Sequence, residues 1–420
     1  MTPSATTPHG NWKNNSAGYQ MLLVFLLSLN FGIVFFDRQA LNVLMPQVQP
    51  DLMLTQTQIG LIAGGLSGTW AIAAFGVGKL SDTLGKRKAL LIASTVAFSL
   101  CSFLTGIATT FALLFGARLL MGVCEGGVMP ISHAMVASEV DPAKRGLAQG
   151  VAQNLGSNLL GSFAAPAILV PLALAAGWHH AFYLAGVPGL LSAALMWFLL
   201  REPAKLAPAA GAEASMTMWD AIKLRNIWVV VVVGVLMVAH FVITWAFMPL
   251  YLVQHKGFDV STGGWIMSSL GIAAAIYAFA ISGLSDRIGR KPVMVWLPFL
   301  SVVGPLAALY YHGPAIVLVA FFFVGWAVNG IFPIFMATIP SESVDAHHHA
   351  AVLGLAMGAC EILGGVFGPP VAGFLNDKIG PDTWLYLLMG LAVISGFVSM
   401  GLRETAPLVL ARKGLQPATA

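Results

Sequence analysis

The segment GKLSDTLGKRK, from Gly78 to Lys88, recurs in the second half of the chain as SGLSDRIGRKP, from Ser282 to Pro292. Both copies keep the run Leu-Ser-Asp, a Gly three residues after the Asp, and two basic residues directly after that Gly. An internal repeat indicates a duplicated structural unit and constrains the architecture more firmly than any single segment. Each copy lies between the second and third of six hydrophobic runs, so we predict two halves of six segments each.

The composition identifies an integral membrane protein. Of the 420 residues, 58% are hydrophobic and only 9% are charged, and the mean hydropathy is +0.82. A water-soluble surface cannot be built from so few polar residues. Runs of about 20 apolar residues, long enough to cross a bilayer as helices, lie at 20–46, 58–78, 88–107, 110–134, 146–172, 181–200, 227–253, 263–283, 292–311, 314–339, 350–375 and 383–402. We predict an all-α membrane protein with twelve transmembrane helices in two pseudo-symmetric six-helix bundles.

The polar stretches divide the chain into five parts. Residues 1–18 are rich in Ser, Thr, Asn and Pro and lack a cleaved signal pattern, so a disordered cytoplasmic N-terminus is expected. The N-terminal six-helix bundle then covers 19–200, and an Ala- and Pro-rich cytoplasmic linker covers 201–226, ending in a short surface helix at 216–223. The C-terminal six-helix bundle covers 227–403, and a cytoplasmic tail covers 404–420.

The basic residues indicate the orientation in the membrane. Apart from Arg38, Arg118, Lys256 and Lys378, every Lys and Arg lies in segments that the twelve spans place on one side. By the positive-inside rule this side is the cytoplasm, so both termini are cytoplasmic. The net charge of +4 follows from this placement and does not imply a nucleic-acid partner. The three cysteines fall inside spans without a metal-binding spacing and are interpreted as packing residues.

Two adjacent charges, Asp37 and Arg38, lie inside the first hydrophobic run. Charges at membrane depth are costly, so a functional role is the default hypothesis. The Arg38 guanidinium stays charged and presents a planar fork that matches a carboxylate. Adjacent helical residues point about 100° apart, so Asp37 and Arg38 cannot simply neutralise each other. Asn42, one turn after Arg38, shares its face and is a candidate to orient it.

The fourth run carries a second charged pair. Arg118 and Glu125 are seven residues apart, two helical turns along one face, so both can point into the same polar cavity. One interpretation is a buried ion pair that only fixes helix packing. The other is that Glu125 carries a proton near a switchable Arg118, because burial and a nearby cation act on its pKa in opposite directions.

At these residues the chain resembles the major facilitator superfamily, through its twelve spans, its loop motif and the fourth-span run Arg118-x-x-x-Gly122-x-x-Glu125-Gly126. With Asp37 and Arg38 added, it resembles the anion:cation symporter branch, which includes bacterial sugar-acid permeases and vesicular anion transporters. The resemblance implies that Arg38 contacts a substrate carboxylate and that Asp37 and Glu125 are protonation sites. Beyond the coupling protons, no cofactor or metal is implied.

The repeated loop motif is a candidate conformational latch. An Asp near a helix end and a cation after a Gly turn can pair with a facing helix terminus. The alternative is that the cations only set topology, which does not explain the repeated Asp and Gly. The latch candidates in the two copies are Asp82, Gly85 and Arg87, and Asp286, Gly289 and Arg290.

Two positions depart from the pattern of the anion:cation branch. Phe35 stands where the branch often has Tyr, so a hydroxyl is missing and a more hydrophobic ligand is one consequence. Glu361 stands in the segment where the branch commonly has Asn. Glu361 is a substrate-hydroxyl acceptor, a second proton site, a partner for a cation elsewhere, or a packing residue, and the sequence leaves these open.

Further candidates to line a cavity are an Asn in the fifth span and two Trp and an Asn in the second half. Asn154 could bind substrate or serve hydrogen bonding between helices. Trp245, Trp326 and Asn329 could wall an aromatic ligand, although aromatic residues in spans more often pack or anchor. The substrate is therefore either a sugar acid or an aromatic or hydroxy acid.

Together, these features and the resemblance predict a proton-coupled symporter that imports an organic carboxylate by alternating access. The alternative is a proton-antiport exporter of drugs or metabolites, which Arg38 disfavours because it would repel cationic drugs. An enzyme is not expected, because the longest loop has about 26 residues, too few for a catalytic domain. We expect a monomer in a bacterial inner membrane, with the lipid bilayer and a small organic anion as its partners.

Overall fold

The computed structural model describes residues 11–141, 144–203, 218–344, 349–412 and 414. These residues form helices and no strands. Eleven helices of the described residues are long and apolar enough to cross a membrane, and the shorter apolar helix Thr383–Ser399 follows them. The prediction of an all-helical membrane protein with twelve spans is confirmed.

The first six spans begin after a short 3₁₀ helix, η1 (Asn11–Asn14). Spans one to three are α1 (Ala17–Asp51), α2 (Gln56–Leu84) and α3 (Arg87–Gly106). The fourth span joins α4 (Phe111–Glu125) to α5 (Val128–Glu139). The fifth consists of α6 (Arg145–Gly150), the π-helical segments η2 (Val151–Leu155) and η3 (Ser157–Ala164), and α7 (Ala165–Ala176). The sixth is α8 (Trp178–Leu199).

The last six spans follow the short helix α9 (Met218–Lys223). Spans seven and eight are α10 (Arg225–Gln254) and α11 (Val260–Ile288), and span nine joins α12 (Arg290–Ser301) to α13 (Val303–Tyr310). Span ten runs through α14 (Ala315–Gly325), the 3₁₀ helix η4 (Trp326–Ile331), the π-helical η5 (Ile334–Thr338) and α15 (Ile339–Glu342). Span eleven runs through α16 (His349–Ala359), the π-helical η7 (Cys360–Val366) and α17 (Phe367–Ile379). Span twelve is α18 (Thr383–Ser399), and α19 (Pro407–Arg412) is the last helix.

The expected disorder of residues 1–18 is wrong for residues 11–18. The side chain of Asn15 donates hydrogen bonds to Glu139, to its Oε2 at 2.6 Å and its carbonyl oxygen at 3.2 Å. These bonds fix the chain directly before α1, which begins at Ala17. Residues 1–10, and most of the predicted linker at 204–217, lie outside the described residues.

The chain forms two compact units, each with its own packing. The first comprises Met1–Ala40 and Thr69–Glu213, and the second comprises Leu41–Gly68 and Ala214–Ala420. The boundaries between the units therefore pass through α1 and α2. The six-helix bundles expected at 19–200 and 227–403 stay a prediction.

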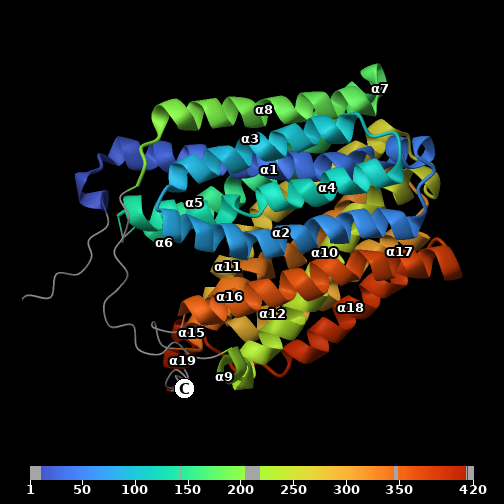
Figure 1. Ribbon diagram of the computed structural model, residues 1–420. Helices are drawn as coiled ribbons and strands as arrows, with labels where there is room; N and C mark the ends of the chain where they lie inside the picture. The colour runs from blue at the N-terminus through green and yellow to red at the C-terminus, as the bar shows by residue number, and fades with distance from the viewer. Residues whose placement is uncertain (1–10, 142–143, 204–217, 345–348, 413, 415–420) are drawn as a thin grey trace, which may run out of the picture. The chain divides into compact units, whose positions relative to one another are not determined.

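Small residues bring helix backbones close together in the first unit, as is common in membrane proteins. A Cβ added at Gly32 would lie 2.7 Å from the carbonyl oxygen of Gly156, so α1 and the fifth span touch through their main chains. The Ser28 hydroxyl donates to the Val151 carbonyl at 2.9 Å and accepts from the Gly156 N–H at 3.1 Å. Figure 1 shows α3 and α8 packed side by side in the same unit.

The second unit is held by a comparable contact between α2 and α17. The Asp377 carboxylate accepts hydrogen bonds from the backbone N–H groups of Gln56 at 3.1 Å and Thr57 at 2.7 Å. It thereby satisfies amides at the start of α2 that have no partner within the helix. A Cβ at Gly60 would clash with the backbone of Pro369, so α17 lies directly against α2 along this stretch.

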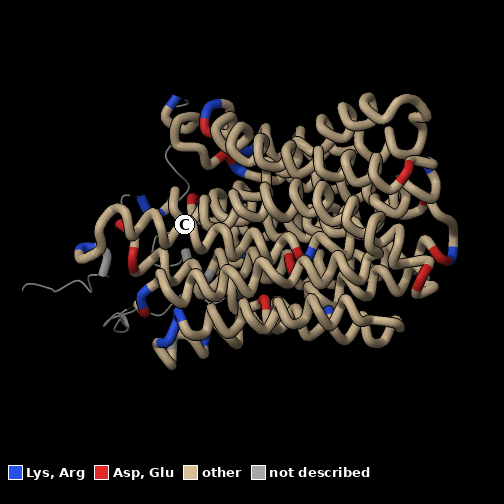
Figure 2. Tube along the Cα trace, turned by 90° about the horizontal axis from the view of Figure 1, so that it is seen from above, with Lys and Arg blue, Asp and Glu red and all other residues tan. Residues whose placement is uncertain are grey.

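Charged residues are gathered at the ends of the helices, and only a few lie midway along them (Figure 2). This is the distribution expected for a protein whose long helices cross a bilayer, because charges at its centre are costly. The charged side chains at mid-helix positions are therefore the first place to look for a functional site.

Candidate functional site

Two ion pairs between α1 and α4 form the charged centre of the first unit. Arg38 Nη2 lies 3.4 Å from Glu125 Oε2, and Arg118 Nη1 lies 3.6 Å from Asp37 Oδ1. The side chains of Asp37 and Glu125 are 0% exposed and that of Arg118 is 1% exposed, whereas that of Arg38 is 20% exposed. Each charged residue of one helix thus pairs with a residue of the other, and Arg118 and Glu125 are not partners of each other.

The pairs are loose and leave hydrogen-bonding capacity unused. Both distances exceed the 2.7–2.9 Å or so of a charge-assisted hydrogen bond. Among the described residues, neither carboxylate oxygen of Asp37 or Glu125 has a hydrogen-bond donor, and Arg38 Nε and Nη2 have no acceptor. Arg118 Nη1 contacts the Asp37 carbonyl oxygen at 3.4 Å and Met121 Sδ at 3.2 Å. The formal charges of the cluster balance, and part of its hydrogen-bonding capacity is unused.

Aromatic rings lie beside both guanidinium groups. The Arg38 Cζ lies 5.4 Å from the ring centroid of Phe35 and 5.5 Å from that of Trp70, and the Arg118 Cζ lies 5.1 Å from that of Phe182. All three distances fall within the range of a cation–π interaction. Trp70 and Phe182 were not singled out from the sequence, because an isolated aromatic residue in a hydrophobic run has no spacing that distinguishes it from a packing residue.

Two cysteines lie beside this cluster. The Sγ atoms of Cys101 on α3 and Cys124 on α4 are 4.0 Å apart, and Cys101 is buried. They form no disulfide. No group of three or more His, Cys, Asp or Glu side chains suited to a metal occurs among the described residues.

Asn154, the predicted site residue of the fifth span, lies in the π-helical segment η2. Its Nδ2 donates to the carbonyl oxygen of Gly150 in the same span, at 3.3 Å. Part of its hydrogen-bonding capacity is therefore used within its own helix. Asn42 lies on α1 one turn beyond Arg38, but it belongs to the second unit.

Three aromatic residues of the second unit form a tight group that contains two predicted site residues. Trp245 and Trp326 are 2% and 4% exposed, and their ring centroids are 6.2 Å apart in an edge-to-face arrangement. Phe241, missed at the sequence level, stacks on Trp326 at 5.7 Å. Neither indole N–H of the two tryptophans has an acceptor among the described residues. Asn329 donates to the Trp326 carbonyl oxygen at a long 3.5 Å.

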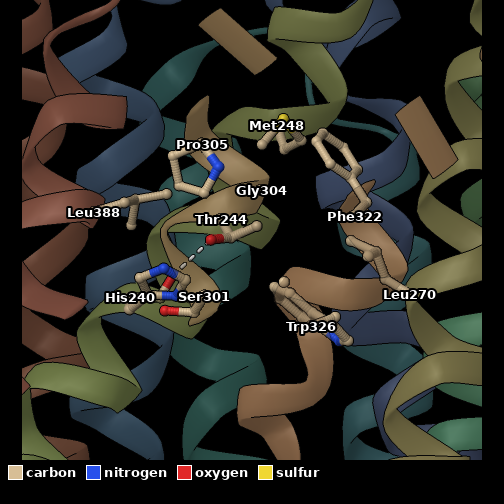
Figure 3. Close-up of a pocket in the computed structure, with 11 residues that line it drawn as sticks. His240, Thr244, Met248, Leu270, Ser301, Gly304, Pro305, Phe322, Trp326 and Leu388 are labelled. Atoms are coloured by element: carbon tan, nitrogen blue, oxygen red, sulfur yellow. Dashed lines mark hydrogen bonds between the residues drawn. The ribbon is translucent and has the colours of Figure 1, made fainter. Parts of the chain in front are cut away.

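A small cavity lies beside Trp326 within the second unit (Figure 3). The volume available to the centres of water molecules is about 20 Å³, and about 10–15 Å³ suffices for one water. His240 and Ser301 lie next to each other at its wall, and the His240 Nε2 has no hydrogen-bond partner among the described residues. The lining residues are His240, Thr244, Met248, Leu270, Ser301, Gly304, Pro305, Phe322, Gly325, Trp326 and Leu388. The cavity as it stands fits water rather than a larger molecule.

Several predicted site residues share an unusual backbone. Asn154 lies in η2, Asn329 lies in η4 and Glu361 lies in η7, so each sits where its span departs from the α-helix. Departures of this kind occur frequently at functional sites, because they widen or tighten a helical turn. Glu361 is half-buried, and its Oε2 lies close to Gly365 one turn later.

The second copy of the loop motif forms an ionic network around a buried arginine, Arg290. The Arg290 guanidinium contacts Asp286 Oδ1 at 2.6 Å and Glu342 Oε1 at 2.9 Å, and it donates to the Ser285 hydroxyl at 2.5 Å. Arg290 is 6% exposed. Gly289 has a φ of +112°, a conformation that side chains with a Cβ rarely adopt. The motif thus ties the end of α11 to α15 at the end of the tenth span.

In the first copy, Gly85 has a φ of +66° and Arg87 Nη1 reaches the Ala134 carbonyl oxygen on α5 at 3.5 Å. The side chain of Asp82 lies outside the described residues. The two copies therefore share the Gly turn and a contact from the basic residue to the fourth or the tenth span.

A second repeated element was missed in the sequence. Glu202 accepts from the N–H groups of Lys88 at 2.9 Å and Ala89 at 3.3 Å, and Glu404 accepts from those of Arg290 at 2.7 Å and Lys291 at 3.2 Å. Each Glu thus caps the N-terminus of the third span of its half, from a position just after the last span of that half. The signal was the dipeptide Arg-Glu, which follows both the sixth and the twelfth span at 201–202 and 403–404.

Comparisons with known proteins agree with this fold. The chain is 30% identical over 392 residues to the hexuronate transporter of Bacillus subtilis, covering 88% of this chain and 90% of that one. It is also 30% identical over 360 residues to the 3-(3-hydroxy-phenyl)propionate transporter of Escherichia coli, covering 84% and 85%. The crystal structure of a bacterial homologue of the human lysosomal transporter Spinster superposes with a TM-score of 0.73 at 17% identity, covering 92% of this chain and 95% of that chain.

The family assignment rests on nearly the whole length of the chain. The sequence model described as Major Facilitator Superfamily matches residues 27–263 and 230–418. Members of this family are transporters rather than enzymes, in agreement with the twelve helices and the central charged pairs. The chain belongs to the Major Facilitator Superfamily.

Proposed function

We propose that this protein is a proton-coupled symporter that imports an organic carboxylate by alternating access. Its relatives include transporters named for a hexuronate and for a hydroxyphenylpropionate, both of which are organic acids. Transport of an organic anion therefore has the broadest support, and the coupling to protons is the finer part of the proposal.

The observation that carries the proposal is the state of Arg38. Its side chain is 20% exposed, and among the described residues its ion-pair partner is Glu125 at 3.4 Å, while its buried Nε and Nη2 have no hydrogen-bond acceptor. A carboxylate can bind two such N–H groups side by side in the plane of the guanidinium. Arg38 thus has buried N–H groups that lack an acceptor, and a bound carboxylate would supply one.

Charge balance gives a reason for proton coupling. The cluster holds two cations, Arg38 and Arg118, and two carboxylates, Asp37 and Glu125, which balance each other. A bound monocarboxylate adds one negative charge in a region of low dielectric constant, where an uncompensated charge is costly. One proton taken up by Glu125 restores neutrality and releases Arg38 to bind the substrate. We infer at least one proton for each carboxylate charge.

The other predicted site residues complete the proposal. Asp37 serves as a second proton site through its contact with Arg118, and the loop motifs at Asp82 and Asp286 act as latches that open when substrate closes the cavity. The network around Arg290 supports a latch, because a buried cation held by two carboxylates has two alternative partners. Asn42, Asn154, Glu361, Trp245, Trp326 and Asn329 stay predictions as substrate contacts.

The proposed location is a bacterial inner membrane with both termini in the cytoplasm, and the working form is a monomer. The basic residues that flank the spans support this orientation through the positive-inside rule. Accessibility of a cysteine introduced at Ser16, directly before α1, to a membrane-impermeant thiol reagent tests it in intact cells. Labelling from outside would refute it.

Uptake into proteoliposomes tests the function. An acidic exterior should accelerate uptake of the transported carboxylate, and a protonophore should abolish that acceleration. Glu125→Gln should abolish proton-driven uptake and keep counterflow exchange, because exchange needs no net proton movement. Asp220→Asn is the control, since Asp220 lies in an exposed pair with Lys223. Uptake that ignores the proton gradient would refute symport, and loss of both activities in Glu125→Gln would indicate a structural role.

Arg38→Ala separates the symporter from the proton-antiport exporter. Carboxylate binding should be lost in this variant, because the guanidinium supplies the anion contact. An exporter of cationic compounds would keep its binding, since removal of a cation from the site would not weaken it.

A further inference from the structure

We propose that Trp70, together with Phe35, makes the Arg38 site selective for aromatic carboxylates over polyhydroxylated ones. This inference rests on the proposed role of Arg38 as the anion-binding residue and names the substrate class of that site. It concerns the first unit alone, to which Phe35, Arg38, Trp70 and Glu125 all belong.

The geometry begins with two rings on one cation. The Arg38 Cζ lies 5.4 Å from the Phe35 centroid and 5.5 Å from the Trp70 centroid. Phe35 precedes Arg38 by one turn on α1, whereas Trp70 comes from α2, so the two rings hold the guanidinium from different helices. Trp70 therefore places an aromatic face beside the guanidinium from a second helix.

The position of Phe35 is itself fixed by close packing. A Cβ added at Gly161 on η3 would lie 2.5 Å from the Phe35 Cβ, so the fifth span touches Phe35 at its backbone. Phe31 adds a further ring, with its centroid 5.0 Å from that of Phe35. On the side of α1, the wall beside Arg38 is thus aromatic and tightly packed.

Two positions of this unit that could bind substrate hydroxyl groups, Phe35 and Asn154, are poorly suited to it. Phe35 offers no hydroxyl, and the amide of Asn154 donates to Gly150 within its own span at 3.3 Å. A hydroxyl group that leaves water without gaining a hydrogen bond weakens binding. A sugar acid held by Arg38 would bring several such groups against Phe35 and Trp70, whereas an aromatic ring would stack on them. The chemical class that fits is an aryl carboxylate.

Binding measurements on the purified full-length protein test this selectivity, with 3-phenylpropionate and D-glucuronate as probes. The wild type should bind 3-phenylpropionate more tightly. Trp70→Leu should weaken the binding of 3-phenylpropionate by about tenfold and that of D-glucuronate by less than about twofold, because the variant loses the ring that stacks on the aromatic probe. Trp70→Phe should restore most of the selectivity, since it keeps a ring at the position. Phe35→Tyr should shift the preference toward D-glucuronate.

Trp197→Leu is the matched control, because Trp197 also lies over a cation, the Lys88 Nζ at 5.7 Å, but is 60% exposed at the end of α8. It should change neither affinity. If Trp70→Leu does not fold, Phe35→Leu tests the same selectivity from the other ring.

Three outcomes would overturn the inference. The first is tighter binding of D-glucuronate than of 3-phenylpropionate by the wild type, and the second is an equal loss of affinity for both probes in Trp70→Leu. Either would refute the aromatic preference. If Arg38→Ala still abolished binding, the proposed function would stand. Wild-type protein that binds neither probe nor any other carboxylate would refute the proposed function and this inference with it.

Discussion

Removal of the Asp37 carboxylate by Asp37→Asn should destabilise the protein strongly. Arg118 is 1% exposed, and its nearest carboxylate is Asp37 at 3.6 Å. The variant leaves Arg118 with the Asp37 carbonyl oxygen at 3.4 Å and Met121 Sδ at 3.2 Å as contacts. Breaking a buried ion pair by removing one partner costs about 3–5 kcal/mol, because the other charge stays buried. Arg118→Met should cost a similar amount, since it strands Asp37.

The double variant Asp37→Asn/Arg118→Met should be close to the wild type in stability. It removes both charges, and replacing a whole buried pair by neutral groups is often neutral or stabilising. The two single costs add to about 6–10 kcal/mol, so a double variant that loses about 2 kcal/mol or less would give a coupling energy of at least about 4 kcal/mol. This exceeds the usual coupling of neighbouring residues.

Unfolding of the purified variants by sodium dodecyl sulfate, followed by tryptophan fluorescence, measures these free energies. Glu125→Gln serves as the comparison and should cost less than Asp37→Asn, because Arg38 is 20% exposed and keeps its two aromatic contacts. Additive costs for Asp37 and Arg118, within about 0.5 kcal/mol, would show that the two side chains do not share an interaction and would refute the pairing.

Three further perturbations have defined outcomes in thermal unfolding. Gly289→Ala should cost about 1–3 kcal/mol, because a φ of +112° with a ψ of 153° lies in a region that is essentially restricted to glycine, and because an added Cβ would clash with the Glu404 carboxylate. Gly283→Ala, with open space around its Cβ, should stabilise α11 by about 0.5–1 kcal/mol. Equal effects of the two variants would contradict this. Glu404→Ala should cost about 1–2 kcal/mol through the lost cap of α12, and an unchanged melting temperature would exclude the cap. The hydrogen bonds from Thr262 lower the pKa of Asp259. Asp259→Ala should therefore cost about 1 kcal/mol at pH 7. The difference in stability between the wild type and this variant should disappear as the pH falls below about 4, since stability from a depressed carboxyl pKa is lost on protonation. A difference that stays constant with pH would contradict the assignment.

The sequence was sufficient for the architecture because membrane insertion imposes a length and an apolar composition that single segments reveal. The repeat at Asp82 and Asp286 then marked two halves. The ends of the helices were harder to predict. The helix α1 extends to Asp51 through Pro46 and Pro50, beyond the hydrophobic run that ended near residue 46. The ordered residues 11–18 were missed because the bonds from Asn15 to Glu139 join positions 124 residues apart.

For the candidate site, the sequence identified the four charged residues but not their partners. The pairs Arg38 with Glu125 and Asp37 with Arg118 depend on how two helices face each other, which the spacing within one helix cannot specify. Trp70 gave no signal, because a Trp in a hydrophobic run resembles any packing residue. Glu202 and Glu404 did have a sequence signal, since each follows an Arg just after the sixth or the twelfth span. A repeat of two residues is nevertheless too short to be recognised.

The π-helical segments have a consequence for how single-residue changes act on this protein. In η7 of the eleventh span, the wider turn takes up more residues than an α-helical turn. Deleting one residue there should therefore restore an α-helix and leave the flanking parts of the span facing as they do now. If the wide turn instead moved along the span, each residue that it passed would rotate about the helix axis by about 100°. Movement of the π-helical turn would thus reorient a limited group of side chains of span eleven without turning the rest of that span.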